Sequence, residues 1–242
     1  MPTIYAETSD GIISSGIKPS FAGARDYTGL VTPSTSITDI AFACESLVFT
    51  GRGAAQYRVT RSFFNFDTSG ISGTVSSATF KIVVQVTPST FDFIVISADT
   101  AFTLLAFPPG QPCSTNTLGS QDFDNVDFST PYSAKQTIST RGYGAGYVSV
   151  TLNSDALTAI KNNNCFKIAV VEHDSDYSNS APSGAGQYMG ILFSDYAGTT
   201  KDPALDYTLA TGYGNDISGV AAANIGKVDG VATANIEKVI GV

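Results

Sequence analysis

Apolar and polar residues alternate along most of the chain, and a period of two is typical of β-strands with one buried face. In SSATFKIVVQV (residues 76–86), Ala78 and Phe80 lie on one face, whereas Thr79 and Lys81 lie on the other. The same pattern, bounded by turn residues, predicts further strands at 39–49, 56–67, 91–97, 101–107, 146–152, 165–173, 187–194 and 204–209. The chain is therefore expected to form about ten short strands.

Only one segment, NSDALTAIKNNN (residues 153–164), has helical spacing. Its apolar residues share one face, as expected for two helical turns. Ser154 is the expected N-cap, and Asn163 or Asn164 is expected to leave the helix in the left-handed conformation. Many short strands, a single helix and twenty-three glycines predict an all-β sandwich.

The C-terminus repeats itself with a period of eleven residues. ISGVAAANIGK (217–227) is followed by VDGVATANIEK (228–238) and by VIGV (239–242), which begins a third copy. A unit this short cannot bury its own apolar side chains, so it must dock on a partner or pack against copies of itself. We therefore divide the chain into a sandwich of residues 1–210 and an assembly or attachment tail of residues 211–242.

The tail residues expected to make the assembly contact are the aliphatic ones that recur in each repeat. They are Val220, Ile225, Val228, Val231, Ile236 and Val239. Glycine in each unit disfavours a helix, although eleven residues is also the period of a right-handed coiled coil. The valines and isoleucines are atypical of a solvated linker. We favour extended or turn-rich strands that pair between chains over a helix and over a disordered tail.

Charge narrows the class of partner. Thirteen basic and twenty-one acidic residues give a formal net charge of −8, which opposes binding to nucleic acids and anionic membranes. The first residues, MPTIYAETSDGII, lack the basic and apolar parts of a signal peptide, and no run of eighteen apolar residues predicts a membrane span. With Met1 as the natural start, we expect a protein made in a cytoplasm, with no nucleic-acid or membrane partner.

The three cysteines do not predict a disulfide framework. Cys44, Cys113 and Cys165 are odd in number and widely spaced. This pattern predicts neither a set of disulfides nor a zinc ribbon. We expect three buried thiols.

Residues that carry catalytic or metal chemistry are scarce. His173 is the only histidine, and no Gly-x-Ser-x-Gly elbow is present, so we expect no catalytic residues, no enzyme activity and no cofactor. In EHDSD, Glu172, Asp174 and Asp176 alternate at strand spacing, and carboxylates are ligands for hard cations. We favour a polar strand end followed by a turn over a metal site.

Glycine and tyrosine gather in GYGAGY (residues 142–147). A phosphate-binding loop would need a helix and a lysine after it, and a predicted strand follows instead, so we favour a hairpin turn. Tyr143 and Tyr147, with Tyr132 and Tyr188, are candidates for a surface on which sugar rings stack. Aromatic residues of the sandwich core and rim are the favoured interpretation.

Three segments resemble a known family. RSFFNFDTSGISGTVSSATFKIVV (61–84) resembles the N-terminal half of DNRLRE-type domains, which are jelly-roll sandwiches related to carbohydrate-binding modules. YVSVTLNSDALTAIKNNNCFKIAVVEHDSD (147–176) and KDPALDYTL (201–209) are similar to the strand, helix and strand, and to the closing strand, of such domains. The chain departs from the family in having no tryptophan, and the segment 91–140 has no counterpart. The resemblance implies a jelly-roll β-sandwich.

The C-terminal repeats carry a second, separate resemblance. Tandem GVAxANIxKV units are similar to segments of structural proteins of tailed bacteriophages, especially fibres and decoration proteins. Together the two resemblances imply a virion structural protein, located in the virion, that forms a homo-oligomer and contacts other virion proteins. Phage fibres suggest a trimer. The alternative is a glycan-binding module that recognises a host surface polysaccharide.

Overall fold

In a computed structural model, the described residues are 1–35, 39–51, 53–87, 89–102, 113, 116–139, 146–184, 186–210, 227–228 and 231–232. The strands are β1 (Thr3–Tyr5), β2 (Gly11–Ser14), β3 (Asp39–Phe49), β4 (Gln56–Asp67), β5 (Val75–Val86), β6 (Phe91–Ser97), β7 (Asp127–Pro131), β8 (Gln136–Ile138), β9 (Tyr147–Thr151), β10 (Cys165–Glu172), β11 (Gly186–Leu192), β12 (Ala204–Leu209), β13 (Lys227–Val228) and β14 (Val231–Ala232). The helices are α1 (Phe21–Arg25), α2 (Ser154–Asn162), the 3-10 turn η2 (Asp122–Asp124) and the π-helical turn η3 (His173–Tyr177).

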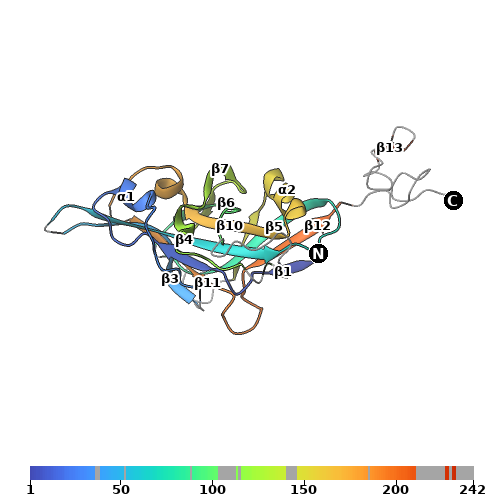
Figure 1. Cartoon of the computed structure of the whole chain (residues 1–242), viewed down its shortest axis with the longest axis horizontal. Coiled ribbons are helices and arrows are strands. Elements are labelled where there is room, and N and C mark those ends of the chain that lie inside the picture. The colour runs from blue at the N-terminus through green and yellow to red at the C-terminus, as the bar shows by residue number, and fades with distance from the viewer. Residues whose placement is uncertain are drawn as a thin grey trace.

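The described strands of the sandwich form one antiparallel sheet that folds over itself. Its order is β1-β12-β5-β11-β3-β4-β10-β6-β7, with β2 on β4, β8 on β6 and β9 on β5. Strand β5 belongs to both layers, because it pairs with β12 from Val75 to Lys81 and with β11 at Val84 and Val86. The molecule is elongated, with α1 and the β3–β4 turn at one end and β1 and the last residues of β12 toward the other (Figure 1).

Two apolar cores cover the central strands on both faces. The larger core joins the β5 layer to the central strands. At its centre, the ring centroid of Phe64 lies 5.4 Å from that of Phe80 and 5.5 Å from that of Phe193. The second core lies on the other face of β4, where Phe63 meets Phe102. A strand buried on both faces has no polar face, which explains why SFFNF does not alternate.

The all-β sandwich is confirmed, and most strand bounds agree with the prediction within two residues. The predicted strand at 101–107 is wrong for Ala101 and Phe102, which are not in a strand, and its other residues lie outside the described part. The expectation of a single helix is also wrong, because Ser20 caps the five-residue α1 through the amide of Gly23. A helix with only two buried residues is too short to leave a period in the sequence.

The ends of α2 also differ from the prediction. Asn153, not Ser154, is the N-cap, and its side chain accepts hydrogen bonds from the amides of Asp155 and Ala156. Asn163 has φ −105° and ψ 139°, which is extended rather than left-handed. Asn164 also lacks a positive φ, so the chain passes from α2 into β10 without the expected left-handed residue.

In the C-terminal repeat, the described residues form a small hairpin. Val228 of β13 lies opposite Val231 of β14, and Lys227 lies opposite Ala232. The other predicted contact residues lie outside the described part of the chain: Val220, Ile225, Ile236 and Val239. The division into residues 1–210 and a tail of residues 211–242 stays a prediction.

Candidate functional site

Aromatic side chains of β3 and β11 gather around an arginine of β4 at the surface. Phe42 and Phe49 are 40% and 37% exposed, respectively. The centroid of the Phe42 ring lies 4.6 Å from that of Tyr188 on β11. The guanidinium carbon of Arg58 lies 5.6 Å from the Phe42 centroid and 5.5 Å from the Phe49 centroid. Arg58 therefore bridges two exposed rings, and we call these four residues the aromatic platform.

Strand geometry places this platform on an extension of the larger core. Residues separated by two along a strand share a face, so Arg58 and Thr60 lie on the same face of β4 as the core residue Phe64. Glu45 lies opposite Thr60 on one side and Tyr188 on the other. The platform thus lies on the same face of the sheet as the larger core, at a place where that face is exposed.

A buried carboxylate fixes the central cation. Nε and Nη2 of Arg58 donate to Oε1 and Oε2 of Glu45 at 2.6 and 3.1 Å, and the hydroxyl of Thr60 donates to Oε1 at 2.6 Å. Burial raises the pKa of Glu45, which is only 1% exposed, and the hydrogen bonds from Arg58 and Thr60 oppose that rise. Among the described residues we find no acceptor for Nη1 of Arg58, so it can donate to a ligand on the platform.

A hollow of about 610 Å³ borders the platform at Phe49, the one platform residue that lines it. Phe49 and Tyr57 line it together with Pro182 from the segment before β11. Aromatic faces beside a fixed hydrogen-bond donor suit a ligand with a flat apolar face and polar edges. The arrangement can bind such a ligand.

The carboxylates of EHDSD are not brought together as a cation site. Glu172 accepts hydrogen bonds from the amides of Asp174, Ser175 and Asp176 at 2.7, 2.8 and 3.1 Å and so caps η3. The expected strand spacing is wrong, because His173–Tyr177 form a helical turn. In the described ranges, no group of three or more His, Cys, Asp or Glu side chains has an arrangement that could hold a metal ion.

Asp176 instead belongs to a buried ion pair with the arginine of the Arg-Ser-aromatic motif. Nε and Nη2 of Arg61 donate to its two oxygens at 2.8 and 2.7 Å, and both side chains are fully buried. Nη1 of Arg61 donates to the carbonyl of Phe123 at 2.6 Å, and Nη2 donates to that of Arg25 at 2.8 Å. This pair has a structural role, because every nitrogen of the guanidinium is occupied.

The single histidine also lies within η3. Nδ1 of His173 is 2.8 Å from Oδ1 of Asp174, and its ring stacks on Tyr177 at 5.4 Å between centroids. Both contacts are local to the turn. The geometry therefore gives His173 a role in ordering this turn.

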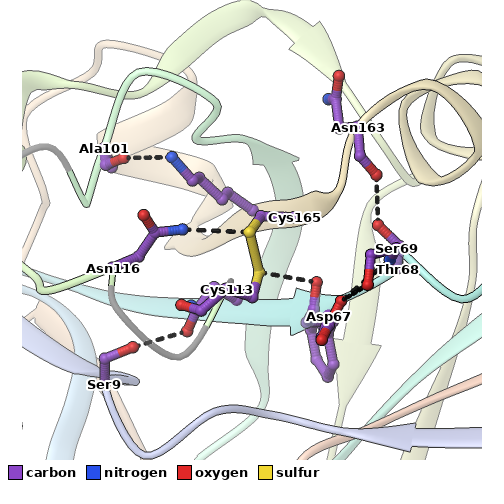
Figure 2. The surroundings of a disulfide bond; sticks show 12 residues. Ser9, Asp67, Thr68, Ser69, Ala101, Cys113, Asn116, Asn163 and Cys165 are labelled. Atoms are coloured by element: carbon purple, nitrogen blue, oxygen red, sulfur yellow. Dashed lines mark hydrogen bonds between the residues drawn. A yellow bond between two sulfur atoms is a disulfide. The ribbon is translucent and has the colours of Figure 1, made fainter. Parts of the chain in front are cut away.

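The cysteine prediction is wrong for two of the three residues. Cys113 and Cys165 form a disulfide across 52 residues of sequence (Figure 2). Nδ2 of Asn116 donates to Sγ of Cys165 at 3.2 Å, and Sγ of Cys113 lies 3.3 Å from the carbonyl oxygen of Phe66. Only Cys44 is a free, buried thiol. A separation this long carries no local signal, so only the tertiary structure shows the pairing.

The four candidate tyrosines do not form one surface. Tyr132 is buried in the larger core, and the hydroxyl of Tyr147 on β9 donates to the carbonyl of Asp202 at 2.9 Å. Tyr143 lies outside the described residues, which leaves Tyr188 as the one candidate on the platform. The phenylalanines and Arg58 were missed, because β3 has a register shift opposite Met189 and Ile191 that alternation does not reveal.

The comparisons with known proteins add no family. Neither a scan against protein-family models nor a search of curated proteins returns a match for this chain. The resemblances to DNRLRE-type domains and to phage structural proteins therefore stay predictions that rest on the sequence motifs. In the described part of the chain, we find no helix with the length and apolar character needed to cross a membrane.

Proposed function

We propose that the chain is a non-enzymatic structural protein of a tailed-bacteriophage virion, a fibre or capsid decoration. The sandwich faces outward, and the C-terminal repeats join the chain to other copies of itself and to other virion proteins. The observation that supports this most is the polarity of the fold. Strand β12, the last strand before the predicted tail, ends toward the end of the molecule opposite α1 and the β3–β4 turn (Figure 1).

This polarity suits a tethered domain. Strand β12 ends at Leu209, directly before the predicted tail, and pairs with β1. Strand β3 ends at Phe49, beside the β3–β4 turn. A tether at the β12 end would hold the platform away from the surface to which the tail is attached. Contact with the particle and contact with the environment are thereby separated along one molecule.

Two further features agree with a place on an external particle. Disulfides persist in oxidising surroundings such as particle surfaces, and Cys113–Cys165 is one. The hairpin at Val228 and Val231 places two of the predicted contact residues opposite each other. A two-stranded hairpin is marginal alone, so it would gain stability by pairing with another copy of the tail.

Truncation after Ala210 tests the proposal. We expect the shortened chain to keep its circular-dichroism spectrum and cooperative melting, because the two cores lie within residues 1–210. We also expect it to be monomeric by light scattering and absent from purified particles by quantitative mass spectrometry. The matched control is the full-length Lys227→Gln variant, which changes an exposed tail residue. It keeps the aliphatic residues Val220, Val228 and Val239. A truncated chain that still enters particles at full occupancy would contradict the proposal.

The aromatic platform favours the second candidate function, recognition of a host surface glycan. Sugar rings stack on flat aromatic faces, and Nη1 of Arg58 can donate to a hydroxyl group at the ring edge. A glycan array with the full-length protein is the test, repeated with Phe42→Ala and Phe49→Ala. Tyr5→Ala is the control, because Tyr5 is 41% exposed on β1, away from the platform. Equal binding by all three variants would exclude the platform as the glycan site.

A further inference from the structure

A buried carboxylate fastens the N-terminal segment to the connection between β11 and β12. Asp10 is fully buried and lies directly before β2. Its Oδ1 accepts a hydrogen bond from the hydroxyl of Ser194 at 2.7 Å, and its Oδ2 accepts one from the amide of Ser194 at 3.0 Å. The hydroxyl of Ser194 is also 3.2 Å from the carbonyl oxygen of Glu7. Ser194 thus clasps both ends of the segment 7–10.

The charged groups around this clasp are mostly acidic. Burial is the largest cause that raises the pKa of Asp10 to about 7; the hydrogen bonds from Ser194 oppose the rise, and the charges of Asp195 and Asp202 add to it. Asp202 is 6% exposed, and its Oδ1 has no hydrogen-bond partner. Within the described part of the same connection, the basic Lys201 contacts the hydroxyl of Tyr196.

The remaining neighbour on the N-terminal segment is also acidic. Burial and the charge of Asp67 on β4 raise the pKa of Glu7. An ionised, fully buried Asp10 would therefore lie near the charges of Asp195 and Asp202. A neutral Asp10 avoids this repulsion: its Oδ2 can still accept from the amide of Ser194, and its protonated Oδ1 can donate to the hydroxyl oxygen of Ser194, whose own proton can then go to the carbonyl of Glu7.

The clasp adjoins an edge of the sheet. Among the described strands, β1 pairs with β12 alone, from Thr3 opposite Asp206 to Tyr5 opposite Ala204. The amide of Ala6 donates to the carbonyl of Pro203 at 2.8 Å, so the same segment connects β1 to Asp10. A short edge strand held by few contacts depends on what fastens the chain next to it.

We propose that the contact between Asp10 and Ser194 is a proton-controlled latch on the edge strand β1. It holds the N-terminal segment firmly in mildly acidic solution and weakly in mildly alkaline solution. This device is independent of the proposed virion function, because it uses residues of the sandwich only.

The direction in which closure of the latch depends on pH follows from proton binding to Asp10. An exposed Asp has a pKa of about 3.9, whereas Asp10 in the closed latch has a pKa of about 7. The closed form therefore binds the proton more tightly, and the contribution of the latch is complete below about pH 4. It falls by up to roughly tenfold in the ratio of closed to open forms for each pH unit up to about 7. Above that pH the ratio is low and constant.

Two measurements on the full chain test the latch. Carbon-detected NMR of the Asp10 carboxyl should give a titration midpoint near 7, and a midpoint near 4 would overturn the proposal. Hydrogen exchange of a peptide covering residues 1–12, corrected for the intrinsic effect of pH, should be at least tenfold faster at pH 8 than at pH 5.5. A peptide from β10 should show no such change.

Asp10→Asn supplies the variant arm, because an amide mimics the neutral acid. Its residues 1–12 should remain protected at both pH values, while the control Asp124→Asn, at an exposed position, should behave as the wild type. Exchange in the wild type that does not change between pH 5.5 and 8 would overturn the latch. Millimolar calcium that restores protection at pH 8 would also contradict it, because a cation would then replace the proton.

Discussion

Replacing Arg61 by Met should remove much of the stability of the sandwich. Methionine fills a similar volume but donates no hydrogen bonds. The change leaves the buried carboxylate of Asp176 with only the longer ion-pair contact to Nε of Arg25 at 3.8 Å, and it leaves the carbonyl oxygens of Phe123 and Arg25 without their donors. Removing one partner of a fully buried ion pair typically costs about 3–5 kcal/mol. A domain of this kind has a free energy of unfolding of about 5–15 kcal/mol, so the loss is a large share.

Urea unfolding followed by far-ultraviolet circular dichroism measures this loss. We expect the midpoint to fall while the slope with urea stays constant, because the fold and its buried surface are retained. The control is Lys135→Met, which removes a surface pair with Asp92 and should change the midpoint little. In a double-mutant cycle, Arg61→Met with Asp176→Leu should cost less than the two single changes added together. A loss below about 1 kcal/mol in Arg61→Met would refute the assignment of this pair as the structural centre of the η3 end.

Three further changes have defined outcomes. Cys165→Ser should lower the free energy of unfolding by about 4 kcal/mol, from the entropy of a loop of 52 residues, and the wild type in reductant should match the variant. Asn153→Ala should cost about 1 kcal/mol by loss of the α2 cap, whereas Ser154→Ala should cost much less, as thermal melts would show. Gly186→Ala should be strongly destabilising, because φ is +75° and a Cβ would lie 2.3 Å from the carbonyl oxygen of Ser46, whereas Gly51→Ala meets nothing within 4 Å and should melt like the wild type.

Local patterns predicted the sandwich well because alternation reports burial on one face. The bounds Phe91–Ser97 and Ala204–Leu209 agree with the structure, since turn residues flank both segments. The 173–177 segment could not be predicted in this way. Its turn is fixed by Glu172, whose carboxylate binds three successive amides, and not by any period of apolar residues. Helix-cap chemistry at the end of a strand is easily mistaken for a polar strand end.

The candidate site was harder to predict than the fold. Phe42 and Arg58 are sixteen positions apart in the sequence, and they come close because β3 and β4 are neighbouring strands. The pairing of β3 with β11, on its other side, also contains a register shift. The disulfide joins Cys113 to Cys165 across several strands and has no local signature. Sequence therefore suggested aromatic binding chemistry through Tyr188 but not its location. The partners of a site are set by tertiary contacts that composition does not encode.

The oligomeric state with and without the repeats tests the central claim most directly. Light scattering of the full chain and of residues 1–210, at equal concentration, compares the two masses. We expect an oligomer for the full chain, a trimer by the phage resemblance, and a folded monomer for the truncated one. Two monomers, or two oligomers of the same order, would contradict the claim that the eleven-residue repeats join this protein to its neighbours.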